Sequence, residues 1–224
     1  MDFLFRLEQR FLERWHRAGV DLRDAAKVFK KLLEAHQHWS RGYHDMNHPI
    51  DLVRELNAWR MFAEDPDAVF DCILWHDKRM RFMRDVTDNE EQSAEDFEFD
   101  TARFGLSRAY VEKVKLLIVR GTKHKGEAAT LDEKLMADMD LAGFGYPWPV
   151  VLAASRRIRH EWRHEPADTY VTTRRAGLQM FHDRGKNLYH LPVFQDEYGA
   201  RALANIAHEI EILPDIVKQF DAGK

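Results

Sequence analysis

The chain of 224 residues has few cysteines, glycines and prolines, and their scarcity excludes several fold classes. Cys72 is the only cysteine, so no disulfide can form within the chain and nothing indicates an oxidising compartment. Eleven glycines and seven prolines are too few for a turn-rich sandwich or barrel and favour long regular segments. Gly-rich phosphate loops, Cys-x-x-Cys pairs, internal repeats and low-complexity tracts are absent from the sequence.

Long apolar runs and a surplus of basic charge are also missing. No apolar segment approaches the length needed to span a membrane, and the charged residues among the first fifteen argue against a signal-peptide core. The formal net charge of −4 argues against a general nucleic-acid or membrane-surface binder. We therefore expect a cytoplasmic protein without membrane or nucleic-acid partners. Neither composition nor charge indicates an oligomeric state.

Helical patterning is present along the whole chain. Apolar residues make up 45% and recur at three- and four-residue spacing from the first segment onward. Asp65-Pro66 and the capping box that begins at Thr130 mark helix starts, and no linker divides the chain. The sequence predicts one all-α domain over residues 1–224, a bundle of roughly seven to ten helices with an apolar helix over 68–77 at its centre.

The first candidate metal ligands lie at the end of that central helix. Residues 71–77 read Asp-Cys-Ile-Leu-Trp-His-Asp, an apolar run that ends in His76 and Asp77. Burying an imidazole and a carboxylate is costly unless each is paired or bound to a metal, which favours a metal site. The pair alone is a weak signal, because His-Asp is common and adjacent helical residues point about 100° apart.

Two histidines precede the next helical pattern upstream. His44 and His48 stand four apart, a spacing that stacks side chains on one helix face. Pro49 disfavours helical geometry at His48, so we expect the helix to start at His48 or Pro49, with His44 in the lead-in turn. A histidine pair in a turn can equally be a helix cap or a surface feature. The first two predicted helices, before these histidines, offer no chemistry.

Three later segments carry further candidates. The basic stretch 78–84, which includes Arg81, is expected to be a loop that either holds an anionic substrate or is simply solvated. His124 lies in a polar loop. In the helix after Thr130, either Asp138 faces solvent and Asp140 caps the following turn, or one of them binds a metal. They cannot both face one ion from a regular helix, being about 200° apart.

Taken in order, these residues resemble the HD-domain superfamily of metal-dependent phosphohydrolases. Its signature is a histidine, a His-Asp pair and a distant aspartate. Residues 43–48, Tyr-His-Asp-Met-Asn-His, and 88–94, Asp-Asn-Glu-Glu-Gln-Ser-Ala, are similar to elements of one bacterial branch of predicted phosphohydrolases. Shorter matches bring the motif-bearing part to about 39–205: Thr122-x-His124, Asp138-x-Asp140-Leu141, Ile158-Arg159-x-Glu161-Trp162 and Glu197-x-x-Ala200-Arg201.

The resemblance implies a fold, a ligand set and an activity. It implies an HD-domain-like helical bundle in which a divalent metal is held by His48, His76, Asp77 and Asp140. This nitrogen and oxygen set suits Zn, Fe, Mn, Ni, Co or Mg. His44 and His124 are then candidate catalytic acids or phosphate donors, and either could instead bind a second metal. Further residues would hold a ligand in place or contact substrate, namely Asn89, Glu90, Asp138 and Arg81.

The implied function is hydrolysis of a small phosphorylated substrate, such as a nucleotide, by metal-activated water. Asp45, where the branch has asparagine, together with Pro49, leaves an alternative. In it the chain is a catalytically weak metal- or ligand-binding sensor or interaction module. A purely structural helical protein is the third alternative, and it gives no reason for Asp77 and Asp140 in apolar contexts.

Overall fold

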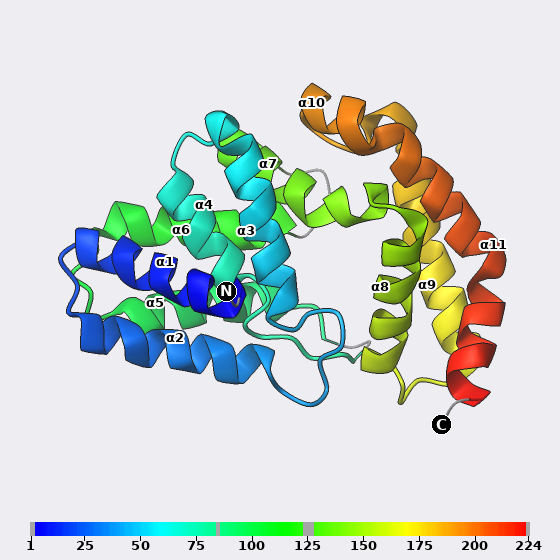
Figure 1. Ribbon diagram of the computed structural model, residues 1–224, viewed down its shortest axis with the longest axis horizontal. Helices are drawn as coiled ribbons and strands as arrows, with labels where there is room; N and C mark the ends of the chain where they lie inside the picture. The colour runs from blue at the N-terminus through cyan, green and yellow to red at the C-terminus, as the bar shows by residue number, and fades with distance from the viewer. Residues whose placement is uncertain (1–2, 84–85, 123–127, 223–224) are drawn as a thin grey trace. The chain divides into compact units, whose positions relative to one another are not determined.

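The computed structural model describes residues 3–83, 86–122 and 128–222, and no strand occurs among them (Figure 1). Within these ranges the all-α prediction is confirmed, as is the predicted number of helices, because ten helices have ten or more residues. They are α1 (Phe3–Arg17), α2 (Leu22–His36), α3 (Asn47–Trp59), α4 (Pro66–Trp75), α5 (Asn89–Thr101), α6 (Arg108–Thr122), α7 (Leu131–Leu141), α8 (Trp148–Glu161), α9 (Ala167–His182) and α11 (Ala200–Ala222).

The chain divides by its contacts into two compact units, Met1–Met136 and Ala137–Lys224. The single domain over 1–224 stays a prediction of the sequence. None of the described helices combines the length and the apolar character needed to cross a membrane.

Helix α4 lies at the centre of the first unit. The Asp65 side chain caps its first turn by accepting a hydrogen bond from the Ala68 amide at 3.0 Å, and Pro66 occupies the first helical position, as predicted. Every residue from 68 to 75 is buried, and α4 packs against α3, α5 and α6. A helix that is apolar on nearly all sides is a buried helix, and His76 and Asp77 follow directly at its C-terminal end.

Aromatic rings fill the space around α4. The Trp75 ring lies 6.0 Å from that of Phe11 on α1 and 5.2 Å from that of Phe97 on α5, measured between centroids. A buried carboxylate, Asp71, also joins α4 to its neighbours, accepting from Arg14 at 3.1 Å and from the Tyr110 hydroxyl at 2.5 Å. These contacts fix α4 in place, and with it the end that carries His76.

The second unit is built on α11, which packs against α8, α9 and the short helix η2 (Ala142–Gly145) (Figure 1). Helix α11 continues through Pro214 without a break. It is preceded by the three-residue helix α10 (Pro192–Phe194) and a π-helical turn, η4 (Gln195–Gly199). A Cβ on Gly199 would lie 1.8 Å from Gln195 Nε2, so any other residue at this position would require the Gln195 side chain to move.

Candidate metal centre

His76 and Asp77 occupy the turn that follows α4. The helix ends at Trp75, and the His76 amide still donates to the Cys72 carbonyl at 2.9 Å, whereas Asp77 has left the helix. The predicted helix over 68–77 is therefore two residues too long at its C-terminal end. The early end matters for the site, because outside a regular helix two adjacent side chains need not point 100° apart.

His48 reaches the same point from α3. The helix begins at Asn47, one residue before the predicted start, so His48 lies in its first turn despite the following Pro49. A proline is tolerated there because the first amides of a helix have no partner within it. His48 and Pro49 are both buried, which excludes the alternative of a surface feature for His48.

The three side chains converge on one point. His48 Nε2 lies 3.2 Å from His76 Nε2, and Asp77 Oδ2 lies 3.0 Å from His76 Nε2 and 3.5 Å from His48 Nε2. Ligands at about 2.0 to 2.2 Å from one ion are separated by distances of this size. Among the described residues these three form a group of His, Cys, Asp or Glu side chains that could hold a metal ion, with ligand atoms within 4.8 Å of one another.

The tautomer of His76 suits metal binding. Its Nδ1 lies 2.9 Å from the Ile73 carbonyl oxygen, and since a carbonyl can only accept, Nδ1 carries the proton and donates. When His76 is neutral, its unprotonated nitrogen is therefore Nε2, the atom that lies next to His48 Nε2 and Asp77 Oδ2. A backbone carbonyl that fixes the far nitrogen of an imidazole is a common arrangement behind metal-binding histidines.

Asp77 is ionised at this point. Burial by itself raises the pKa of the carboxyl group, but the positive charges that His76, His44 and His48 can carry lower it, and the net pKa lies well below its usual range. Metals bind the deprotonated carboxylate, so Asp77 needs no proton release at neutral pH before it can serve as a ligand.

His44 lies beside this trio without belonging to it. Its half-buried ring lies 5.7 Å from the His48 ring and 6.0 Å from the Phe82 ring, between centroids, in the segment that leads into α3. The predicted lead-in position is therefore confirmed. Its role as a catalytic acid stays a prediction. The other candidate acid, His124, lies outside the described residues.

The two aspartates of α7 have different surroundings. Asp138 is fully buried, and its carboxylate oxygens accept from the backbone amides of His190 at 2.8 Å and Leu191 at 2.7 Å. The alternative in which Asp138 faces solvent is therefore wrong. Asp140 is half-buried in the last turn of α7 and belongs to the second unit. Its place in the ligand set stays a prediction.

The remaining candidates lie around the loop after α4, which is not helical in the described residues 78–83, as predicted. Asn89 pairs with the backbone of Arg81, accepting from its amide at 3.2 Å and donating to its carbonyl at 3.3 Å. The exposed Arg81 guanidinium binds Asp88 at 2.7 Å. Glu90 lies half-buried in the first turn of α5. A substrate contact by these residues stays a prediction.

Sequence reasoning missed a histidine at the end of α2. His36 is buried and donates from Nδ1 to the Leu32 carbonyl at 2.9 Å, which leaves a bare lone pair on Nε2, as in His76. Burial, followed by the charge of Arg41, lowers the pKa of His36 to about 3, with smaller effects from Asp77 and His76. Its place on the buried face of α2, four residues after Leu32, was the available signal in the sequence.

No protein-family model, curated protein or solved structure matches this chain. The likeness to HD-domain phosphohydrolases therefore rests on the motifs quoted above, and the site has to be judged on its own geometry.

Proposed function

We propose that this chain is a metal-dependent phosphohydrolase of the HD type, acting on a small phosphate ester. The observation that carries the proposal is the convergence of two imidazole nitrogens and one carboxylate oxygen, all buried, within 4.8 Å of one another. Two imidazole nitrogens and a carboxylate oxygen that can reach one point form a ligand set that a divalent transition metal binds.

In this proposal the chain's own residues have separate tasks. His48, His76 and Asp77 hold the ion, and Asp140 is the fourth ligand that the resemblance implies. The bound ion would supply an acidified water and neutralise charge at phosphorus. His44, beside His48, delivers a proton to the leaving oxygen, since the ordinary pKa of histidine suits proton transfer at neutral pH.

The test begins with protein purified without added metal. Elemental analysis should find about one divalent transition metal per chain, and a panel of phosphomonoesters and nucleotides should contain a hydrolysed substrate. Asp77→Asn should abolish both. Asp51→Asn, which changes an exposed carboxylate on α3, is the matched control and should change neither.

The outcomes separate the functions. Metal without hydrolysis of any panel member would overturn the hydrolase and favour the metal-binding sensor. A wild-type protein that binds no divalent metal at all would overturn both.

A further inference from the structure

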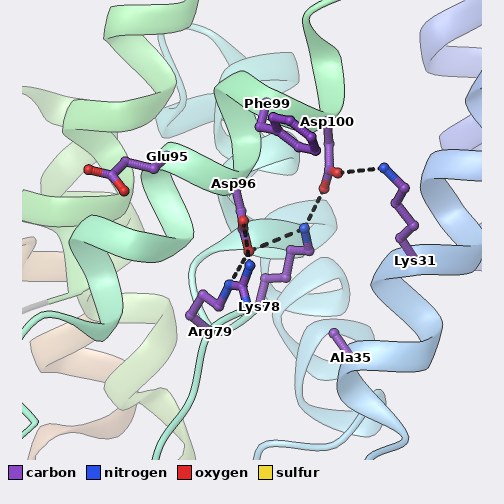
Figure 2. Close-up of a pocket in the computed structure, with 8 residues that line it drawn as sticks. All are labelled: Lys31, Ala35, Lys78, Arg79, Glu95, Asp96, Phe99 and Asp100. Atoms are coloured by element: carbon purple, nitrogen blue, oxygen red, sulfur yellow. Dashed lines mark hydrogen bonds and ion pairs between the residues drawn. The ribbon is translucent and has the colours of Figure 1, made fainter.

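The residue after Asp77 is held more firmly than a loop residue needs to be. The Lys78 side chain is 11% exposed, and its ammonium lies 2.5 Å from Asp100 Oδ2 and 3.2 Å from Asp96 Oδ2, both on α5. These groups form one side of a pocket of about 580 Å³ between α2 and α5. Figure 2 shows Lys78 between the two carboxylates, with Lys31 approaching Asp100 from the other side.

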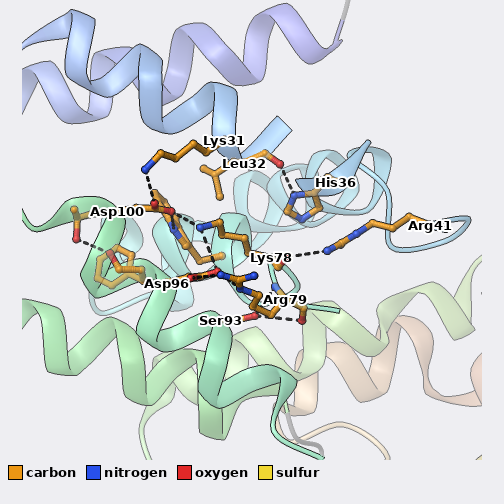
Figure 3. A network of polar contacts seen from close by, with 12 residues as sticks. Lys31, Leu32, His36, Arg41, Lys78, Arg79, Ser93, Asp96 and Asp100 are labelled. Carbon is orange, nitrogen blue, oxygen red and sulfur yellow. Dashed lines mark hydrogen bonds and ion pairs between the residues drawn. The ribbon is translucent and has the colours of Figure 1, made fainter. Parts of the chain in front are cut away.

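The backbone of the same segment is held from two further directions (Figure 3). Arg41 donates through Nη2 to the Lys78 carbonyl at 2.8 Å and through Nη1 to the His44 carbonyl at 2.9 Å. The Arg79 amide donates to Ser93 Oγ at 2.9 Å. One guanidinium thus ties the segment after Asp77 to the segment that leads into the His48 helix.

These contacts compensate for the loss of helical hydrogen bonds beyond Trp75. A metal ligand has to be held to within a few tenths of an ångström, and a ligand in a turn depends on its neighbours for that. We propose that Lys78 is a positioning residue, whose ammonium between Asp96 and Asp100 fixes the Asp77 carboxylate at the metal. The inference rests on the proposed metal site and does not require hydrolysis.

The network offers a matched control. Lys31 binds the same Asp100 at 3.1 Å, but it lies on α2 and is half-exposed. Lys78→Met leaves both carboxylates with a cation, since Asp96 keeps Arg79 at 2.5 Å and Asp100 keeps Lys31. The fold should therefore survive the substitution. Its effect on metal binding should come from the freed Asp77 segment.

The experiment titrates Co²⁺ into the full chain after removal of metal by a chelator. Visible absorption reports both affinity and coordination geometry. Lys78→Met should weaken Co²⁺ binding about 10- to 100-fold, as changes behind a ligand commonly do, and should alter the absorption bands. Lys78→Arg should restore most of the affinity, and Lys31→Met should stay within about twofold of the wild type.

Binding and bands of Lys78→Met that match the wild type would overturn the inference and leave the proposed function intact. So would an equal loss in Lys31→Met, which would indicate a general effect of the network. If Lys78→Met does not fold, as judged by thermal melting without metal, Lys78→Gln tests the same position, because it removes the ammonium charge and keeps hydrogen-bond donors for Asp96 and Asp100. It should weaken binding, and an unchanged affinity would overturn the inference. A wild type that binds no Co²⁺ would overturn the metal site itself, and the inference with it.

Discussion

Two buried polar clusters in this protein are alike in burial and opposite in chemistry. In the second unit, Glu209 on α11 is fully buried, and its Oε1 accepts from the Ser155 hydroxyl at 2.9 Å and from the Arg174 Nε at 3.0 Å. Donors there meet an acceptor. In the first unit, His48, His76 and Asp77 bring three atoms that can bind a metal to within 4.8 Å of one another. The type of atoms that converge, rather than burial of charge, distinguishes a candidate ligand site from a structural ion pair.

Some of the motifs that resemble the HD-domain superfamily contribute to the candidate metal site, and others make structural contacts in the second unit. Arg159, from the Ile-Arg-x-Glu-Trp motif, binds the Trp162 carbonyl at 2.6 Å and Asp221 at 3.1 Å. Arg201, from the Glu-x-x-Ala-Arg motif, donates to the Gly145 carbonyl. These two arginines hold backbone and helix ends within the second unit. Part of the ordered motif series is therefore scaffold.

The largest effect should come from removing a ligand. His76→Ala or Asp77→Ala takes one of three converging atoms, so metal affinity should fall by more than the roughly 100-fold seen for changes behind a ligand. His44→Ala should keep the metal and lower turnover about 10²- to 10⁴-fold, the usual contribution of a general acid. Metal content and steady-state kinetics check both. Stoichiometric metal in the His76 and Asp77 variants would show that the site is elsewhere.

Glu209→Ala tests the other side of the comparison. It removes the acceptor that Ser155 and Arg174 share and should lower the free energy of unfolding by about 3 kcal/mol, because the Arg174 side chain is only 19% exposed. Metal affinity should not change. Glu211→Ala, on the same helix but exposed, should have an effect below about 0.5 kcal/mol. Urea unfolding measures both, and loss of metal in Glu209→Ala without loss of stability would reverse the structural assignment.

Helix α7 carries both kinds of carboxylate: Asp138, which binds backbone amides, and Asp140, the proposed metal ligand. Asp138→Asn would turn an amide N–H toward a backbone N–H and should cost about 1 to 3 kcal/mol in unfolding free energy, with at most a 10- to 100-fold loss of metal affinity. Asp140→Asn should lower metal occupancy sharply, with little effect on stability. If Asp138→Asn empties the site and Asp140→Asn does not, the ligand is Asp138 and the prediction is reversed.

His36 should give the smallest effect, visible in its pH dependence. The folded pKa of about 3 lies below the ordinary value of 6.5, so as pH falls through 6.5 the unfolded chain takes up a proton that the folded chain does not. Stability should therefore fall on acidification, by about 1 kcal/mol for the first pH unit below 6.5. The free energy of unfolding, measured at several pH values on chelator-treated protein, should fall with decreasing pH more steeply for the wild type than for His36→Gln, by this amount. Parallel curves would contradict the lowered pKa.

Much of the fold could be predicted from local patterns in the sequence. Apolar spacing gave the all-α class, Asp65-Pro66 gave the start of α4, and the uninterrupted apolar run from 68 to 75 marked it as buried. Helix ends were less accurate, as the start of α3 and the end of α4 show. Hydrogen bonds of the terminal residues depend on tertiary partners, and the sequence does not display them.

The sequence by itself determined which residues could bind a metal, because residue type sets ligand chemistry: an imidazole and a carboxylate at the end of an apolar helix, with two histidines upstream. Only the tertiary structure decided which of them meet. It placed His48 beside His76 and Asp77, although 28 residues of chain separate the two histidines. It also placed the Asp138 carboxylate where it accepts hydrogen bonds from the amides of His190 and Leu191, and the Lys78 ammonium beside Asp100 of α5. Side chains from separate helices converge through packing, and periodicity along one helix carries no information about that distance.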